Sequence, residues 1–145
     1  MSVIAPTWRA GLTLERLNTI AQRTLVEHLA IKVTAFDEQG LHGTMPVEAR
    51  HCQPMRILHG GASVAFAETL ASIGANAMLE EGFAAVGQEI NANHLRSVPE
   101  GASVSGIARL LHSGSRSQVW SVEIRNAAGQ LTCISRVTMA VITRR

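Results

Sequence analysis

The first stretch of the chain carries apolar residues at helical spacing. Leu14, Leu17 and Ile20 fall on one face of a short helix, and Thr13 stands where its side chain can cap the first turn. Beyond this stretch the spacing of apolar residues changes towards two, which is typical of strands. The pattern predicts a short helical decoration at about residues 12–29, ahead of a β-rich domain.

Two strand-like runs and an irregular loop come next. Residues 31–47 carry strand-like patterns on both sides of residues 37–40, whose composition is typical of a turn, so a hairpin is expected here. Residues 47–58 form a polar, irregular segment. Pro46 directly precedes it, and Pro54 lies within it. Loops of this kind often carry functional residues.

A long apolar helix is predicted over about residues 60–79. It is built almost wholly from Ala, Ser, Gly and medium-sized apolar residues, and such small side chains allow another element to pack closely. Turn signals then separate four strand-like runs at 84–93, 102–112, 117–125 and 131–143.

The order of these elements favours the α+β class. One long helix followed by consecutive strands predicts a curved antiparallel sheet wrapped around that helix, within a single domain at 1–145. A doubly wound parallel sheet is disfavoured because the strands do not alternate with helices. Since the sheet leaves part of the helix circumference uncovered, we expect a second subunit to cover the rest.

Composition and charge exclude several classes of protein. The 145 residues are 46% hydrophobic and 17% charged, unlike a disordered chain, and a net charge of +2 is too small to indicate a nucleic-acid partner. Residues 57–79 are apolar but hold Glu68 near their centre, which argues against a membrane span. Cys52 and Cys133 show neither metal-ligand nor disulfide spacing, and the N-terminus does not resemble a secretory signal. We therefore expect a cytoplasmic protein without a bound metal.

Glu68 is the most informative residue for chemistry. It is the one acidic or basic side chain, histidine aside, between Arg56 and Glu80, and a carboxylate among apolar residues is costly unless it is paired or used. It is therefore either a structural carboxylate, satisfied by an arginine or by backbone donors, or a catalytic group.

The start of the predicted helix is unusual as well. Gly60 and Gly61 follow His59, and the N–H groups of a first helical turn are unpaired and lie at the positive end of the helix dipole. Glycine lets a substrate approach that backbone, so this turn can polarise a carbonyl or hold an oxyanion. The alternative is a flexible cap beside a core histidine.

Spacing along the helix links these two features. Gly60 and Glu68 are eight positions apart, or ~12 Å along a helix axis. One small carbonyl cannot contact both groups of one helix, so a site that uses both must be shared by two subunits. Ser72 lies one turn beyond Glu68 on the same face, where it either orients the carboxylate or a water, or serves as a small packing residue.

Three runs of residues carry a resemblance to a known family. Residues 58–69, 87–97 and 112–116, together with Trp120, resemble the hotdog-fold acyl-CoA thioesterases. Within that superfamily they are similar to the bacterial branch that includes the 1,4-dihydroxy-2-naphthoyl-CoA hydrolase and the enterobactin proofreading thioesterase. The resemblance extends over about residues 12–142, and it implies a hotdog subunit that forms dimers and commonly tetramers.

The resemblance also implies roles for single residues. The carboxylate of Glu68 would act as nucleophile or general base, and the N–H of Gly60 would polarise the thioester oxygen. Gln53 would help hold the thioester or the water, with His59 beside it and Ser72 near the acyl group. Coenzyme A would contact the segments that contain Gly87, His94, Leu95, Arg96, Ser97, His112, Ser115 and Arg116. No cofactor is required, because CoA is part of the substrate.

One motif departs from the family pattern, and the arginine content is unusual in itself. Met55-Arg56 occupies a place where related sequences often have an aromatic residue and a glycine, so we expect a reshaped acyl pocket with a charge closer to it. Lys32 is also the one lysine among thirteen Lys and Arg residues, and arginine binds phosphates and carboxylates bidentately. Arg96 and Arg116 are assigned to CoA phosphates or else to ordinary surface, and the other arginines to surface.

The sequence thus predicts an enzyme that hydrolyses acyl-CoA thioesters, with an aromatic or bulky acyl group such as dihydroxynaphthoyl or benzoyl. A hotdog dehydratase and a non-catalytic acyl-CoA-binding module remain as alternatives. The expected partners are the acyl-CoA, further copies of the chain in a homodimer or homotetramer, and an acyl carrier protein if the substrate is carrier-bound. Neither a nucleic acid nor a membrane is expected.

Overall fold

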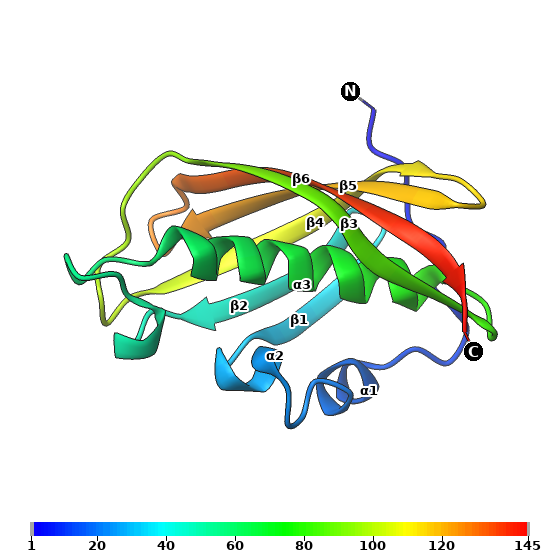
Figure 1. Cartoon of the computed structure of the whole chain (residues 1–145), viewed down its shortest axis with the longest axis horizontal. Coiled ribbons are helices and arrows are strands. Elements are labelled where there is room, and N and C mark those ends of the chain that lie inside the picture. Colours follow the sequence, from blue (N-terminus) through cyan, green and yellow to red (C-terminus); the bar gives the residue numbers. More distant parts are fainter. Residues whose placement is uncertain (1, 145) are drawn as a thin grey trace.

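A six-stranded antiparallel sheet curves around one long helix in the computed structural model, which describes residues 2–144. The helix, α3, spans Gly60–Met78 and lies in the curve of the sheet (Figure 1). The strands are β1 (Lys32–Asp37), β2 (Gly40–Pro46), β3 (Phe83–His94), β4 (Ser103–Ser113), β5 (Ser117–Asn126) and β6 (Leu131–Thr143). The predicted α+β class and the predicted order of elements are confirmed.

The spatial order of the strands is β1-β2-β4-β5-β6-β3. The predicted hairpin is the antiparallel pair β1–β2, and β4, β5 and β6 form a meander. Between β2 and β3 the chain forms α3 and crosses the concave face, so that β3 pairs with β6 at the opposite side of the sheet. As a result, β1 and β3 are the two edge strands.

Close contact between α3 and the sheet depends on glycine residues, which leave room where another residue would have a side chain. Gly43 and Gly106 face each other across β2 and β4, and a Cβ atom at either would lie 2.6 or 2.7 Å from a methyl carbon of Leu70. In the opposite direction, Gly74 of α3 leaves room for the ring of Trp120, which would lie 3.0 Å from an added Cβ. Leu70 and Trp120 are fully buried at 0% exposure. The small residues of the helix therefore do allow the close approach that the sequence predicted.

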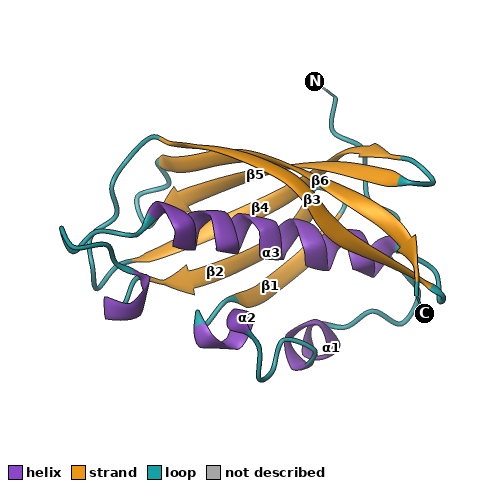
Figure 2. Ribbon diagram, in the orientation of Figure 1, coloured by secondary structure: helices purple, strands orange, loops and turns teal. Residues whose placement is uncertain are grey.

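The N-terminal decoration consists of helices α1 (Leu14–Thr19) and α2 (Leu25–His28), which lie beside β1 and α3 (Figure 2). The Thr13 hydroxyl accepts a hydrogen bond from Arg16 N–H at 3.2 Å and caps α1, as predicted. Of the predicted apolar face, Leu17 is buried, whereas α1 ends at Thr19 and Ile20 is 67% exposed, so Ile20 does not extend that face. A short 3-10 helix, η1 (Ala49–His51), precedes α3. Within residues 2–144, no helix is long and apolar enough to cross a membrane.

Substitution of Gly40 tests how closely the β1–β2 hairpin packs against β4. Its φ is 147°, and an added Cβ would overlap the carbonyl of Ala108. We expect Gly40→Ala to lower the free energy of unfolding by about 2 to 5 kcal/mol, since backbone strain and overpacking add. Gly129→Ala is the matched control, because its φ is 77° but nothing lies within 4 Å, so strain alone costs about 1 to 2 kcal/mol. Urea unfolding measures both, and equal losses would contradict this account.

Candidate active site

The turn that begins α3 presents one free backbone donor. His59 is the N-cap residue, and its Nδ1 accepts a hydrogen bond from Gly61 N–H at 2.8 Å. The N–H groups of Ala62 and Ser63 bond to the His59 carbonyl, whereas Gly60 N–H has no acceptor within the described part of the chain. The helix dipole adds positive potential at this donor. The predicted role of this turn in polarising a carbonyl depends on such a free donor.

Gly60 lines a cavity of about 360 Å³, which we call the donor cavity. His94 stands directly over Gly60, and an added Cβ there would lie 2.9 Å from the ring nitrogen Nε2. Among the described residues that line this cavity Arg96 is the permanent cation, and none is a carboxylate. The predicted residues that the fold brings together here are Gln53, Gly60, His94, Leu95, Arg96 and Ser97.

A buried histidine, His51, holds the loop that carries Gln53. His51 is 0% exposed, and its Nδ1 accepts from Glu48 N–H at 3.1 Å while its Nε2 lies 2.8 Å from the carbonyl oxygen of Leu29. The Nε2 atom therefore carries the proton and donates to Leu29. The side-chain oxygen of Gln53 accepts from Met55 N–H, which leaves the amide NH₂ of Gln53 as a donor at the cavity.

Glu68 lines a second cavity of about 350 Å³, which we call the carboxylate cavity. Glu68 is its one acidic or basic residue, and the other lining residues are apolar or carry hydroxyl groups: Leu25, Val26, Ala65, Thr69, Ser72 and Ile73. Ser72 lies one helical turn beyond Glu68 on the same lining, as predicted. Within residues 2–144 no arginine, lysine or histidine forms an ion pair with Glu68.

The Glu68 carboxylate rests against the backbone of strand β3. A Cβ atom added at Gly87 would overlap Glu68 Oε1, so the absence of a side chain at Gly87 makes room for the carboxylate. Gly87 is thus placed beside the candidate catalytic acid in this chain. A negative group near an exposed edge strand and next to an apolar cavity is well placed to meet a neutral, electrophilic carbonyl.

Comparison with known proteins gives the family. Residues 55–133 match the model of the thioesterase superfamily, and this range includes Gly60, Glu68 and His94. The chain belongs to the thioesterase superfamily.

Relatives of this thioesterase extend over almost its whole length. It is 44% identical to the 1,4-dihydroxy-2-naphthoyl-CoA hydrolase of Escherichia coli, over 93% of this chain and 98% of the relative. It is equally 44% identical to the proofreading thioesterase EntH of Cronobacter turicensis, again over 93% and 98%. The crystal structure of a thioesterase from Haemophilus influenzae superimposes with a TM-score of 0.89 at 45% identity, covering 94% of each chain. The fold is the hotdog fold, and the protein is a thioester hydrolase.

A single chain of the thioesterase does not bring all predicted residues together. The donor and carboxylate cavities share no lining residue. His94 pairs with Cys133 at one end of β6, whereas Ser117, next to the β4–β5 turn, pairs with Ala140 near the other end. That separation is ~23 Å along the strand at 3.3 Å per residue. The predicted CoA-binding residues His112, near the end of β4, and Ser115 and Arg116, in the turn, are exposed, and they therefore lie far from the donor cavity of the same chain.

Met55 and Arg56 do not line either cavity of the thioesterase subunit. Arg56 has a φ of 61° and donates from Nε to Glu100 Oε2 at 2.8 Å. This hydrogen bond and the charge of Glu100 raise the pKa of Arg56. The expected extra charge at the acyl pocket is therefore absent from the described lining, because Glu100, 44 residues away, binds the guanidinium at the surface.

Sequence reasoning missed several lining residues of the thioesterase. Leu25 and Val26 of α2 form a wall of the carboxylate cavity, although the sequence indicated only a decoration there. The adjacent apolar pair at the start of α2 was the available signal. Ser63 and Thr132 line the donor cavity, and both are buried. Ser63 lies within the run 58–69 that carries the family resemblance, but no role was predicted for it, and Thr132 stands in none of the runs that carry it. The two residues meet only when β6 packs beside β3 and α3.

Gly87 tests whether the Glu68 carboxylate needs its place against β3. Gly87→Ala adds a methyl group where Glu68 Oε1 lies, so the carboxylate must move. Because a displacement of about 1 Å can cost about 100-fold, we expect the kcat for thioester hydrolysis to fall ~100-fold. Gly129→Ala, at a glycine in the β5–β6 turn where nothing lies within 4 Å of an added Cβ, is the control and should retain its kcat. Unfolding midpoints establish that both variants fold, and an unchanged kcat in Gly87→Ala would refute the role.

Proposed function

We propose that this thioesterase hydrolyses CoA thioesters of aromatic or otherwise bulky acyl groups, in a site completed by a second copy of the chain. The observation that carries the proposal is the division of the machinery between two cavities. Gly60 N–H lies in one and the Glu68 carboxylate in the other, ~12 Å apart along α3. A single carbonyl cannot reach both within one chain.

Edge strand β3 supplies the geometry for a second copy. Gly87 of β3 touches Glu68, whereas His94, at the end of the same strand, stands over Gly60. Because β3 is an edge strand, its outer backbone groups are free to pair with another strand. An antiparallel pairing of β3 with its own copy exchanges the two ends, so the partner's donor cavity would face this chain's carboxylate cavity. Such an arrangement is self-complementary, as in most twofold dimers.

The chemistry follows from the two groups. With the carbonyl oxygen polarised by Gly60 N–H, Glu68 either removes a proton from a water that adds to the carbonyl carbon, or adds itself. In both routes the C–S bond breaks and the CoA thiolate leaves, and it is then protonated. In the second route an acyl-carboxylate anhydride forms and water hydrolyses it, which regenerates Glu68. Neither route requires a metal or an added cofactor.

The carboxylate cavity favours a large acyl group. Its walls are mainly apolar, from Leu25, Val26, Ala65 and Ile73, and about 350 Å³ is available. Thr69 and Ser72 add hydroxyl groups that can hydrogen-bond to a substituent on an aromatic ring. The name of one relative, a 1,4-dihydroxy-2-naphthoyl-CoA hydrolase, supports the same class of substrate.

The other residues predicted to bind CoA lie too far apart for one chain, so we assign them to a site shared by several copies of the chain. Arg96 donates from Nη1 to the Leu131 carbonyl at 2.9 Å and keeps other guanidinium donors for phosphate. Arg116 lies on the distant β4–β5 turn, so it would serve the site of another subunit in a dimer or tetramer. A carrier protein that presents the same pantetheine thioester is a possible second partner. Two free thiols, Cys52 and Cys133, fit a reducing cytoplasm.

The two alternative functions make different demands. A dehydratase would convert a hydroxyacyl thioester without releasing thiol, and a non-catalytic module would bind acyl-CoA without any conversion. The family match and the free Gly60 donor favour hydrolysis. Thiol release therefore distinguishes hydrolysis from both alternatives, and conversion of a hydroxyacyl thioester without thiol release would distinguish the dehydratase from the binding module.

Removal of the carboxylate should abolish catalysis and leave the fold intact. We expect Glu68→Ala to lower kcat for benzoyl-CoA and 1,4-dihydroxy-2-naphthoyl-CoA by about 10²- to 10⁴-fold, since general bases contribute that much. Thiol release is measured for these two and for a medium-chain acyl-CoA. Glu38→Ala, an exposed carboxylate in the β1–β2 turn, is the control. Unchanged rates in folded Glu68→Ala, or no turnover of any thioester by the native enzyme, would refute the proposal.

Subunit mixing tests whether the site is shared. Gly60→Pro removes the N–H donor at a first helical position, where the backbone suits proline, and its added Cβ also displaces the His94 ring, so it should be inactive on its own. Equal amounts of Gly60→Pro and Glu68→Ala subunits, after exchange, should recover about a quarter of native activity, since half of the dimers are mixed and each holds one intact site. Verified exchange without recovery would show that both groups act within one chain.

A further inference from the structure

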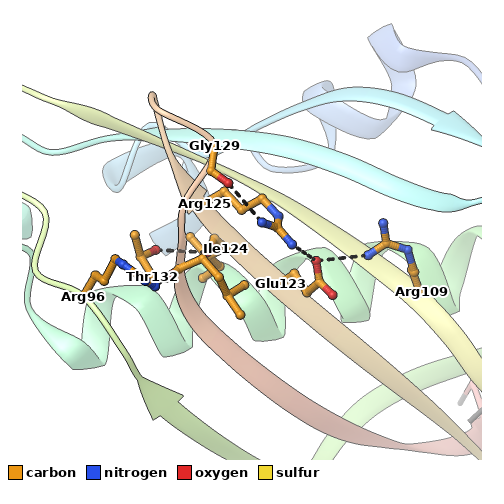
Figure 3. A network of polar contacts seen from close by, with 8 residues as sticks. Arg96, Arg109, Glu123, Ile124, Arg125, Gly129 and Thr132 are labelled. Atoms are coloured by element: carbon orange, nitrogen blue, oxygen red, sulfur yellow. Dashed lines mark hydrogen bonds and ion pairs between the residues drawn. The ribbon is translucent and has the colours of Figure 1, made fainter.

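Some arginines have evident partners in the structure. Arg125 donates to Glu123 Oε2 at 2.8 Å, and Arg109 lies 3.6 Å from the same oxygen (Figure 3). Arg50 similarly pairs with Glu48 at 2.8 Å. These ion pairs account for arginines on the outer face of the sheet and on the loop before α3, and they leave others unexplained.

Three other arginines converge on one cavity near both ends of the chain. This cavity has a volume of about 370 Å³, and we call it the terminal cavity. Its lining residues are all exposed: Arg9, Arg16, Glu80, Glu81, Phe83 and Arg144. It shares no lining residue with the donor cavity or the carboxylate cavity.

The backbone holds these arginines in place. Arg9 N–H donates to Ala77 O at 2.9 Å, which ties the N-terminal segment to the last turn of α3. Arg144 N–H donates to Gly82 O at 2.8 Å, and Arg16 N–H bonds to the Thr13 cap of α1. Three segments of the chain are therefore anchored by their backbone so that Arg9, Arg16 and Arg144 line one cavity.

The guanidinium groups of the terminal cavity are not neutralised by its carboxylates. Within residues 2–144, none of the three forms an ion pair within 4.0 Å, although Glu80 and Glu81 line the same cavity. Within the same residues, the side chain of Arg16 donates one hydrogen bond, to the Gly11 carbonyl at 3.5 Å. The cavity thus keeps several charged donors and two charged acceptors available at once.

We propose that the terminal cavity binds a nucleoside phosphate. Guanidinium groups match phosphate oxygens. Carboxylates accept hydrogen bonds from ribose hydroxyls or from an exocyclic amine. Phe83, 44% exposed at the edge of the cavity, offers an aromatic ring for stacking a base. A nucleotide supplies phosphate, hydroxyl donors and a planar base together, whereas a simple anion would leave the carboxylates opposed to it.

Two sources of this ligand are compatible with the position of the cavity. It lies beyond the end of α3, and Met78 is ~15 Å along the helix from Glu68. The nucleotide end of a substrate CoA would make the cavity part of substrate binding, whereas a separate nucleotide would make it a second site. Only the first source rests on the proposed acyl-CoA function.

Calorimetric titration of the full-length protein tests the site. Adenosine 3′,5′-bisphosphate and ADP should both bind, and inorganic pyrophosphate should bind about fivefold more weakly or worse because it lacks the stacked base. Arg9→Gln and Arg144→Gln should each weaken nucleotide binding about tenfold, as expected for a lost charged hydrogen bond. Phe83→Leu should weaken it about fivefold. Arg136→Gln, an exposed arginine on β6 outside the cavity, should bind as the native protein does.

Kinetics then distinguish the two sources. If the site holds the nucleotide of CoA, Arg9→Gln and Arg144→Gln raise the KM for an acyl-CoA and leave the KM for the matching acyl-pantetheine unchanged. If it holds a separate nucleotide, both KM values stay unchanged while binding is lost. Absence of nucleotide binding, equal affinity for pyrophosphate, or native affinity in the arginine variants would overturn the proposal. Because titration needs no turnover, failure of the proposed thioester substrate would be seen separately.

Discussion

The close contact between α3 and the concave face of the sheet determines where every functional group lies. Phe66 and Leu70 of the helix occupy the depression left by the facing glycines Gly43 and Gly106, and Trp120 of the sheet fills the gap at Gly74. Contacts of this kind fix the helix both along and around its axis, because close-packed interiors tolerate little displacement. The helix can then present Glu68 and Gly60 at defined positions relative to β3.

Strand β3 connects the two halves of the proposed catalytic machinery. One glycine of the strand, Gly87, makes room for the Glu68 carboxylate, and one glycine of the helix, Gly60, makes room for the ring of His94. Both functional groups therefore lie on a helix and strand rather than on mobile loops, which favours precise positioning. Their separation along a rigid helix is also the reason that one chain cannot close the site around a single carbonyl.

The elements were predictable from the sequence because their signals are local. Helical spacing, glycine-containing turns and strand-like runs lie within short windows, and the lone carboxylate of α3 stands out at the same scale. The long-range arrangement was not predictable from such signals. The pairing of Arg56 with Glu100 and the wall that Leu25 forms beside Glu68 both join distant residues, and the exposure of Ile20 depends on where α1 ends. The grouping of Gln53 with His94 followed from the family resemblance rather than from spacing.

The arginine content acquires meaning only through this long-range arrangement. Where a carboxylate lies close, as Glu123 does to Arg109 and Arg125, the charge is used within the protein surface. Where the side chain is exposed on a strand, as Arg136 is on β6, solvent and salt screen the guanidinium. In a concave space that collects several such groups, the same side chain creates a field that attracts anions. Shape therefore decides which arginines are free to bind a ligand, and a count of basic residues cannot distinguish them.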